Sequence, residues 1–174
     1  MKKVLYSVFI TLYALIAVFT TVCLLSYNDF KITQFGDYSL VIISDDNKGE
    51  NFENGDLVVL NKKGKYEVGS PAFYYNNYEK EIHVVSGKVT NIEKITDTEN
   101  TYTMDGDRPV SGQYVLGPVN GAIKVSGVGT VLSVLESKWG FLFLIVFPSL
   151  LAFIYEITVV VSEMRNSKQS KKEK

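Results

Sequence analysis

The chain has 174 residues, of which 46% are hydrophobic, with a formal net charge of −1, one cysteine and one histidine. A single cysteine excludes a disulfide within the chain, and a single histidine leaves few ligands for a zinc site. The charge is unevenly distributed, because residues 28 to 138 hold 16 acidic and 11 basic side chains while both ends are basic. An acidic middle argues against a nucleic-acid partner.

Two long apolar segments lie near the ends of the chain. Val4 to Leu25 has no charged residue, and neither has Gly140 to Tyr155. A helix needs about 20 apolar residues to cross a bilayer, and helix is the backbone form that satisfies its own peptide groups there. We therefore predict transmembrane helices over residues 4–26 and 139–161. A cleaved signal peptide is the alternative for the first segment, which is long for that role and lacks an Ala-x-Ala exit.

The basic residues at the two ends predict the orientation in the membrane. Lys2 and Lys3 lie in the short segment 1–3, and a lysine-rich tail covers residues 162–174. By the positive-inside rule both ends are cytoplasmic. The sequence thus predicts a two-pass protein of the cell membrane, with the lipid bilayer as one partner and residues 27–138 as an extracytoplasmic domain.

Two residues of the second apolar segment are unusual for a membrane helix. Pro148 lacks a backbone N–H, so we expect a kink there. Glu156 is acidic but lies near the cytoplasmic end, where we expect its carboxylate to reach water at the headgroups.

Between the two segments, short apolar runs alternate with turns rich in Gly, Asn and Asp. This pattern, without a long amphipathic helix, predicts an all-β extracytoplasmic domain, sandwich-like or a partial barrel, flanked by two transmembrane α-helices. A short helix is expected over Val128 to Lys138. The expected strands are Phe35 to Ile43, Leu57 to Leu60, Pro71 to Tyr75, Glu81 to Val89 with a break at Gly87, Val89 to Ile95, Thr101 to Met104, Val110 to Val119 and Ala122 to Val125.

Aromatic residues are concentrated in one part of this domain, at Phe73, Tyr74, Tyr75 and Tyr78. We expect them to form strand core. In the alternative, part of them forms an apolar face that lies on the lipid headgroups.

His83 and Asp107 are the candidate catalytic residues. His83 is the natural general base for a hydroxyl nucleophile, because the pKa of histidine lies near neutral pH. A carboxylate such as Asp107 can orient a histidine and stabilise its charged form. The alternatives are a structural histidine and a turn aspartate, since Asp-Gly-Asp is typical of turns. The sequence has no phosphate-binding loop and no metal-ligand cluster, so no cofactor or metal is expected.

Four short blocks follow one another in a recognisable order and spacing. They are Gly-Asp-Leu-Val-Val at residues 55–59, Ile-His-Val-Val at 82–85, Tyr-Thr-Met-Asp-Gly-Asp at 102–107 with Pro-Val and Val-Leu-Gly after it, and the stretch from Val128 through Trp139-Gly140 and Pro148 to Glu156. These blocks resemble type I signal peptidases of the archaeal and endoplasmic-reticulum kind, over about Val41 to Ile157. Val84 stands where the family has arginine.

The resemblance implies a function and roles for named residues. It implies a serine endopeptidase outside the membrane that cleaves signal peptides from exported precursors after small residues at −3 and −1. By the same resemblance His83 is the general base and Asp107 the orienting acid. Signal peptides of exported proteins are then the expected partners.

The nucleophile motif of that family, Ser-x-Ser-Met-x-Pro, is not intact here. The family's spacing can be applied from either side of this loop. Counted back from Gly55-Asp56, it places the nucleophile at Asn47. Counted forward from the strand Leu40 to Ile43, it places the nucleophile at Asp46. Ser44 is the nearest hydroxyl and matches the first, non-attacking serine. Three hypotheses therefore stay open: a peptidase that uses Ser44 with His83, a catalytically inactive homologue that acts as a membrane-anchored binding module, and an unrelated two-span protein.

Overall fold

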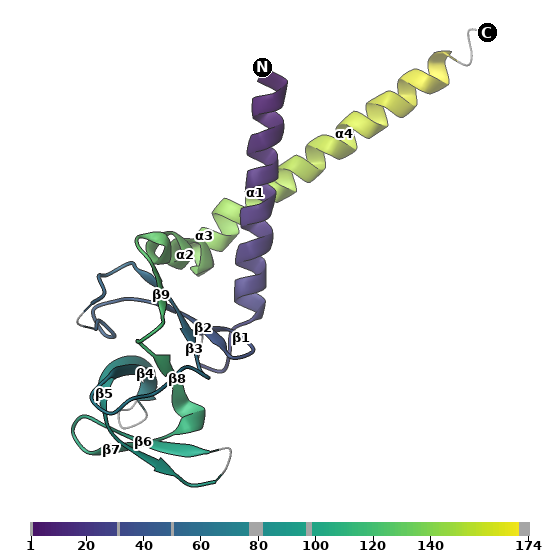
Figure 1. Ribbon diagram of the computed structural model, residues 1–174. Helices are drawn as coiled ribbons and strands as arrows, with labels where there is room; N and C mark the ends of the chain where they lie inside the picture. The colour runs from purple at the N-terminus through teal and green to yellow at the C-terminus, as the bar shows by residue number, and fades with distance from the viewer. Residues whose placement is uncertain (1, 31, 50, 77–81, 97–98, 171–174) are drawn as a thin grey trace. The chain divides into compact units, whose positions relative to one another are not determined.

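The computed structural model of the chain divides into two compact units, Met1–Ser133 and Val134–Lys174. Among the described residues, the first unit holds α1 (Lys2–Leu25) and nine strands, and α2 (Val128–Glu136) crosses the boundary between the units. Figure 1 traces this order of elements. The residues that the structure describes are 2–30, 32–49, 51–76, 82–96 and 99–170.

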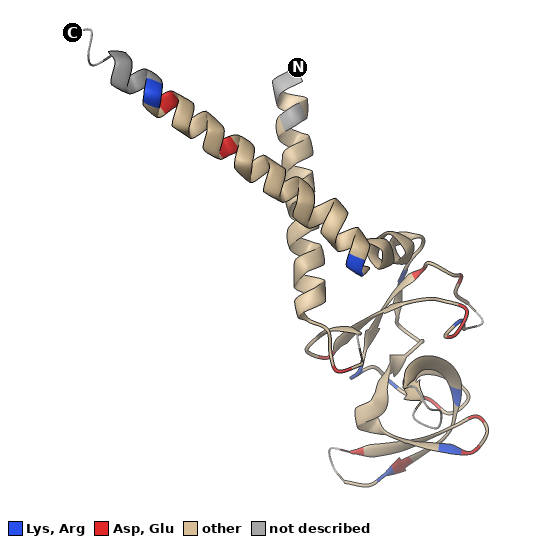
Figure 2. Ribbon diagram, turned by 180° about the vertical axis from the view of Figure 1, so that it is seen from behind, with Lys and Arg blue, Asp and Glu red and all other residues tan. Residues whose placement is uncertain are grey.

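Two helical segments are long and apolar enough to cross a membrane: Ser7–Leu25 within α1, and Lys138–Arg165. Only 11% and 6% of the residues in their most apolar windows are buried within the chain. A core helix of a water-soluble protein would be mostly buried, whereas most of the apolar surface of these two helices is exposed in the described part of the chain. Both helices are tan over most of their length in Figure 2, where charged residues are coloured.

The second helical segment changes its winding before Pro148. It runs as α3 (Lys138–Gly140), a π-helical stretch η2 (Phe141–Val146) and α4 (Phe147–Ser170). Proline cannot donate a hydrogen bond to the carbonyl four residues earlier, and a π-helical turn is one way in which a helix accommodates that loss. The hydroxyl of Ser149 donates to the Ile145 carbonyl at 2.6 Å. The kink predicted at Pro148 stays a prediction, and the structure shows a π-helical stretch shortly before the proline.

The first sheet is antiparallel, with the strand order β1-β2-β3-β9. The single strand expected from Phe35 to Ile43 is wrong in its first part, because Gly36 and Asp37 form a turn, with φ +59° at Gly36. The strands of this first sheet are β1 (Thr33–Phe35), β2 (Tyr38–Ile42), β3 (Leu57–Asn61) and β9 (Ile123–Val125).

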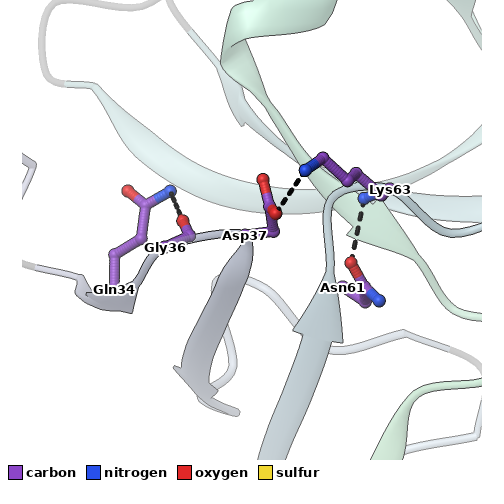
Figure 3. A network of polar contacts seen from close by, with 5 residues as sticks. All are labelled: Gln34, Gly36, Asp37, Asn61 and Lys63. Atoms are coloured by element: carbon purple, nitrogen blue, oxygen red, sulfur yellow. Dashed lines mark hydrogen bonds and ion pairs between the residues drawn. The ribbon is translucent and has the colours of Figure 1, made fainter.

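A small polar network joins this turn to the end of β3, as Figure 3 shows. The Asp37 carboxylate lies 2.7 Å from the Lys63 ammonium, and the Asn61 side chain accepts from the Lys63 backbone N–H at 3.0 Å. Both charged groups are largely exposed, so this ion pair adds little to stability.

The second sheet is also antiparallel, with the order β7-β6-β5-β4-β8. The break expected at Gly87 is wrong, because β5 runs through it and pairs first with β4 and then with β6. A 3₁₀ turn at Gly112–Tyr114 divides the single strand expected over Val110 to Val119. The strands are β4 (Pro71–Asn76), β5 (His83–Lys94), β6 (Asn100–Met104), β7 (Arg108–Ser111) and β8 (Val115–Pro118).

Two apolar clusters form the core of the β-domain, the part of the chain from β1 to β9. The central strand β4 contributes to both: Phe73 and Tyr75 join the first cluster, and Ala72 and Tyr74 join the second. Successive strand residues point to opposite faces, so β4 is buried on both faces. The aromatic run is thus core, as expected, with Tyr78 outside the described residues. The first cluster also includes residues of β2 and β3, and therefore joins the two sheets.

Asn28 fixes the connection between α1 and the β-domain. Its side-chain oxygen accepts from the backbone N–H groups of Phe30 and Ile32 at 3.0 and 3.1 Å. Its amide nitrogen donates to the hydroxyl of Tyr75 at 2.5 Å. The Phe30 ring lies 4.4 Å from that of Tyr75. The chain therefore leaves α1 through a hydrogen-bonded connection, with β1 directly after it.

Candidate functional site

The loop after β2 is held in shape by Asn47. The Asn47 side-chain oxygen accepts from the Ser44 backbone N–H at 2.8 Å, and its amide nitrogen donates to the Ile42 carbonyl at 3.0 Å. This is turn chemistry, in which an asparagine side chain replaces a backbone partner. Ser44 is exposed at the exit of β2. Asn47 is one of the two positions at which the family's spacing places the nucleophile, and its side chain has a structural role here.

The base of the same loop is closed by a buried carboxylate, Asp56. One of its oxygens accepts from the Glu53 backbone N–H at 2.9 Å and lies 3.2 Å from the Lys124 ammonium on β9. The Glu53 N–H holds the pKa of Asp56 below its ordinary value, with Lys124 acting in the same direction and burial opposing both. The Asp56 side chain is only 4% exposed. The loop is therefore anchored to the first sheet at both ends.

His83 opens onto a hollow on the surface of the second sheet. It is the first residue of β5 and is paired in register with Asn76 of β4. The hollow has a volume of about 470 Å³. Its lining comes from β4, β5, the β6–β7 turn and the loop after β2, and consists of Asp46, Tyr74, Asn76, His83, Val85, Ser86, Asp105, Gly106 and Arg108.

The acid of the β6–β7 turn that lines this hollow is Asp105. Asp107 is exposed, has φ +54° as the last residue of the Asp-Gly-Asp turn, and is absent from the described lining. Asp105 approaches because β5 carries glycine at position 87, where a Cβ would lie 2.5 Å from the Asp105 Oδ1 and 3.1 Å from the Tyr74 ring. The structure therefore places with His83 an acid two residues before the one that the resemblance indicated.

Asp46 is the residue of the loop after β2 that lines the same hollow as His83. Neither Ser44 nor Asn47 is among its described lining residues. Ser86, which sequence reasoning did not select, contributes a hydroxyl to the lining. No sequence signal marked Ser86. Asp105 belongs to the block at residues 102–107, but the choice between it and Asp107 depends on how the β6–β7 turn folds over β5.

A second, smaller hollow adjoins the first. It has a volume of about 140 Å³ and shares Ser86 and Asp105 with its neighbour. Phe52 forms an apolar part of its wall and is itself buried in the first core cluster. The two hollows differ in their charged residues: Lys48 and Lys88 line the smaller one, Asp46 and Arg108 line the larger one, and Asp105 lines both.

This lining defines what the surface can do chemically. Carboxylates accept hydrogen bonds, and asparagine and arginine donate them, so the hollow can hold a polar, extended segment of chain. Within the described residues there is no group of three His, Cys, Asp or Glu side chains that could hold a metal ion. A carboxylate at Asp46 cannot replace a serine alkoxide as the nucleophile in serine-type cleavage.

Comparison with known proteins does not name a family: no family model, no curated protein and no solved structure matches this chain.

Proposed function

We propose that the chain is a signal-peptidase-like membrane protein whose extracytoplasmic β-domain binds segments of exported proteins at the hollow beside His83. In this proposal both termini are cytoplasmic, and the two apolar helices anchor the β-domain to the outer face of the cell membrane. The family assignment is supported by the four sequence blocks. The membrane anchoring is supported by the length and composition of the two helices.

The observation that carries the proposal is the meeting of three distant segments at one hollow. The loop after β2, where the family has its nucleophile, supplies Asp46; β5 supplies His83; and the β6–β7 turn supplies Asp105. His83 and Asp105 lie in two of the four blocks, and Asp46 lies in the loop that precedes the first block. The resemblance thus points to the same surface that the hollow marks.

The geometry favours binding over cleavage. Serine-type hydrolysis needs a hydroxyl within hydrogen-bond reach of its base. The loop residue that lines the hollow with His83 is Asp46, and Ser44 is not among the described lining residues. A hollow with two carboxylates can instead accept N–H groups of an extended peptide. The first candidate function is therefore a catalytically inactive, membrane-anchored binding module.

One observation favours a second candidate, a serine endopeptidase that removes signal peptides. Ser44 is exposed at the exit of β2, two residues before Asp46. A movement of this loop on substrate binding would bring a hydroxyl towards His83. In that case Ser44 is the nucleophile, His83 the general base and Asp105, in place of Asp107, the orienting acid.

A peptide-binding assay on the purified protein in detergent tests the first candidate. A labelled segment spanning the signal-peptide region of an exported precursor should bind with a measurable Kd. Asp105→Asn should weaken binding roughly tenfold, since a hydrogen bond to a charged group contributes about 1.5–3 kcal/mol. Asp107→Asn is the matched control and should leave Kd unchanged, because asparagine tolerates the left-handed backbone at this exposed position.

The same incubations decide between the two candidates when they are analysed for cleavage products. The binding module predicts an intact precursor. Cleavage that is lost in both Ser44→Ala and His83→Ala establishes the peptidase instead. Equal effects of Asp105→Asn and Asp107→Asn on binding would show that the hollow is not the binding site.

A further inference from the structure

Helix α2 carries an apolar face that is exposed in the part of the chain that the structure describes. Val128, Val131 and Val134 follow one another at intervals of three residues, which places them along one side of the helix. They are 40%, 60% and 50% exposed. We call these three residues the valine face.

The opposite side of α2 is packed tightly against the turn that ends the candidate-site loop. Gly129 and Leu132 are its buried residues. A Cβ at position 129 would lie 2.6 Å from the Asp56 carbonyl oxygen, so only glycine permits this approach. The Thr130 backbone N–H donates to the Gly55 carbonyl at 3.1 Å. The helix is therefore fixed on the β-domain with its valine face turned away from that turn.

The exposed apolar surface extends into the strand before α2. Ile123 and Val125 of β9 are 63% and 39% exposed, and they share one side of the strand while Lys124 points to Asp56 from the other. Helix α2 has no charged residue before Glu136, its last. An uncharged, apolar helix face of this kind is costly to leave in water.

The chain itself indicates what covers the valine face. Helix α2 ends at Glu136, and the apolar segment that can span a membrane begins at Lys138, two residues later. Two residues of chain reach only about 7 Å. If Lys138–Arg165 spans the bilayer, α2 lies at the level of the headgroups, where amphipathic helices bury their apolar face. Trp139, at the start of the span, is the residue type enriched at that level.

We propose that the valine face of α2 is an interfacial anchor that lies in the headgroup region of the lipid bilayer. The proposal rests on the membrane anchoring assigned under the proposed function. Since the other side of α2 contacts Gly55 and Asp56, this anchor sets the height of the loop that carries Ser44 and Asp46 above the membrane. The bilayer would thus position the candidate site through α2 as well as through the two spans.

Tryptophan fluorescence in liposomes with brominated lipids tests the proposal. Trp139 is the only tryptophan of the chain, so Trp139→Phe provides a background for Val131→Trp. Ser133→Trp is the matched control, because Ser133 is also exposed and lies on the side of the same helix away from Val131. Quenching at position 131 should be at least twice that at position 133. Val128→Trp should behave like Val131→Trp, which guards against a local effect of one substitution.

Each result bears on the proposal in a defined way. Quenching at position 131 no greater than at position 133 overturns it. Protection of position 131 from aqueous iodide without quenching by brominated lipid also overturns it, since a protein surface then covers the face. Trp139 in the unaltered chain separates the two assignments: if it is quenched and position 131 is not, the span stands and the anchor falls. If Trp139 is not quenched either, the span and the anchor both fall, whereas peptide binding at His83 is measured independently.

Discussion

Asp56 shows how one side chain can hold a loop. Its carboxylate is buried, and it is shared between a backbone N–H of the loop and the Lys124 ammonium of β9. A buried carboxylate is tolerated only when such partners compensate its desolvation. The loop that carries Ser44 and Asp46 therefore depends on the charge state of a residue outside the hollow.

The stability of the protein should fall in acid partly through Asp56. The pKa of Asp56 is lowered in the folded state from the ordinary value of 3.8. The stability that it contributes is therefore present above pH 3.8 and is lost as the pH falls through the folded pKa. In thermal unfolding in detergent, Asp56→Asn should lower Tm at pH 7, and the difference from the unaltered protein should shrink below pH 3.8. A difference that stays constant from pH 7 to pH 2.5 would contradict this account.

Gly87 should tolerate no side chain without moving the acid of the hollow. A Cβ there would lie 2.5 Å from the Asp105 Oδ1 and 3.1 Å from the Tyr74 ring. Overpacking costs about 1–3 kcal/mol, so Gly87→Ala should lower the free energy of unfolding and weaken peptide binding together. Asn91→Ala, at an exposed position of the same strand, should change the free energy of unfolding by less than about 0.5 kcal/mol. An effect on stability with unchanged binding would separate Asp105 from the binding site.

At the scale of elements, the helices were predictable and the details of the strands were not. The two apolar helices follow from local composition alone. The turn at Gly36-Asp37 and the 3₁₀ turn at Gly112–Tyr114 were missed, because the strand-like residues on either side of each turn were assigned to one continuous strand. Gly87 was interpreted as a break in the strand. In the structure the strand is continuous, and the missing side chain lets Asp105 and the Tyr74 ring lie close to the backbone of β5.

The candidate site could be predicted only in part, because sequence order identifies motifs but not how the turns fold over β5. His83 and the loop after β2 could be selected from motif order, and both contribute to the hollow. The choice between Asp105 and Asp107 could not be made, since it depends on which end of the Asp-Gly-Asp turn folds over β5. The structural use of Asn47 depends on its hydrogen bonds to Ser44 and Ile42, which no sequence pattern specifies.

The loop after β2 should lose its shape when Asn47 is removed. Its side chain makes two hydrogen bonds, each worth about 0.5–1.5 kcal/mol, so Asn47→Ala should cost about 1–3 kcal/mol of stability. For a domain of this size that is a fall in Tm of several degrees in detergent. Asn51→Ala, an exposed position of the same loop, is the control and should leave Tm nearly unchanged. Equal Tm values for the two variants would refute the role of Asn47.

At the scale of the whole molecule, the account requires that the β-domain and the tail lie on opposite sides of the membrane. In a Cys23→Ala background, Gln113→Cys should react in intact cells with a maleimide that cannot cross membranes. Ser162→Cys should react only after lysis. Both positions are exposed, so a lack of reaction reports the membrane and not burial. The reverse pattern would invert the orientation, and reaction at both positions would exclude two spans.

The central claim, that exported segments bind at the hollow beside His83, is tested most directly by photocrosslinking. A photoreactive phenylalanine derivative in place of the exposed Arg108 lies at the hollow, whereas the same group in place of the exposed Gln113 lies outside it. With a precursor that carries a signal peptide, the account predicts an adduct from position 108 that is strongly reduced by His83→Ala, and little adduct from position 113. Equal adduct yields from the two positions, unaffected by His83→Ala, would contradict it.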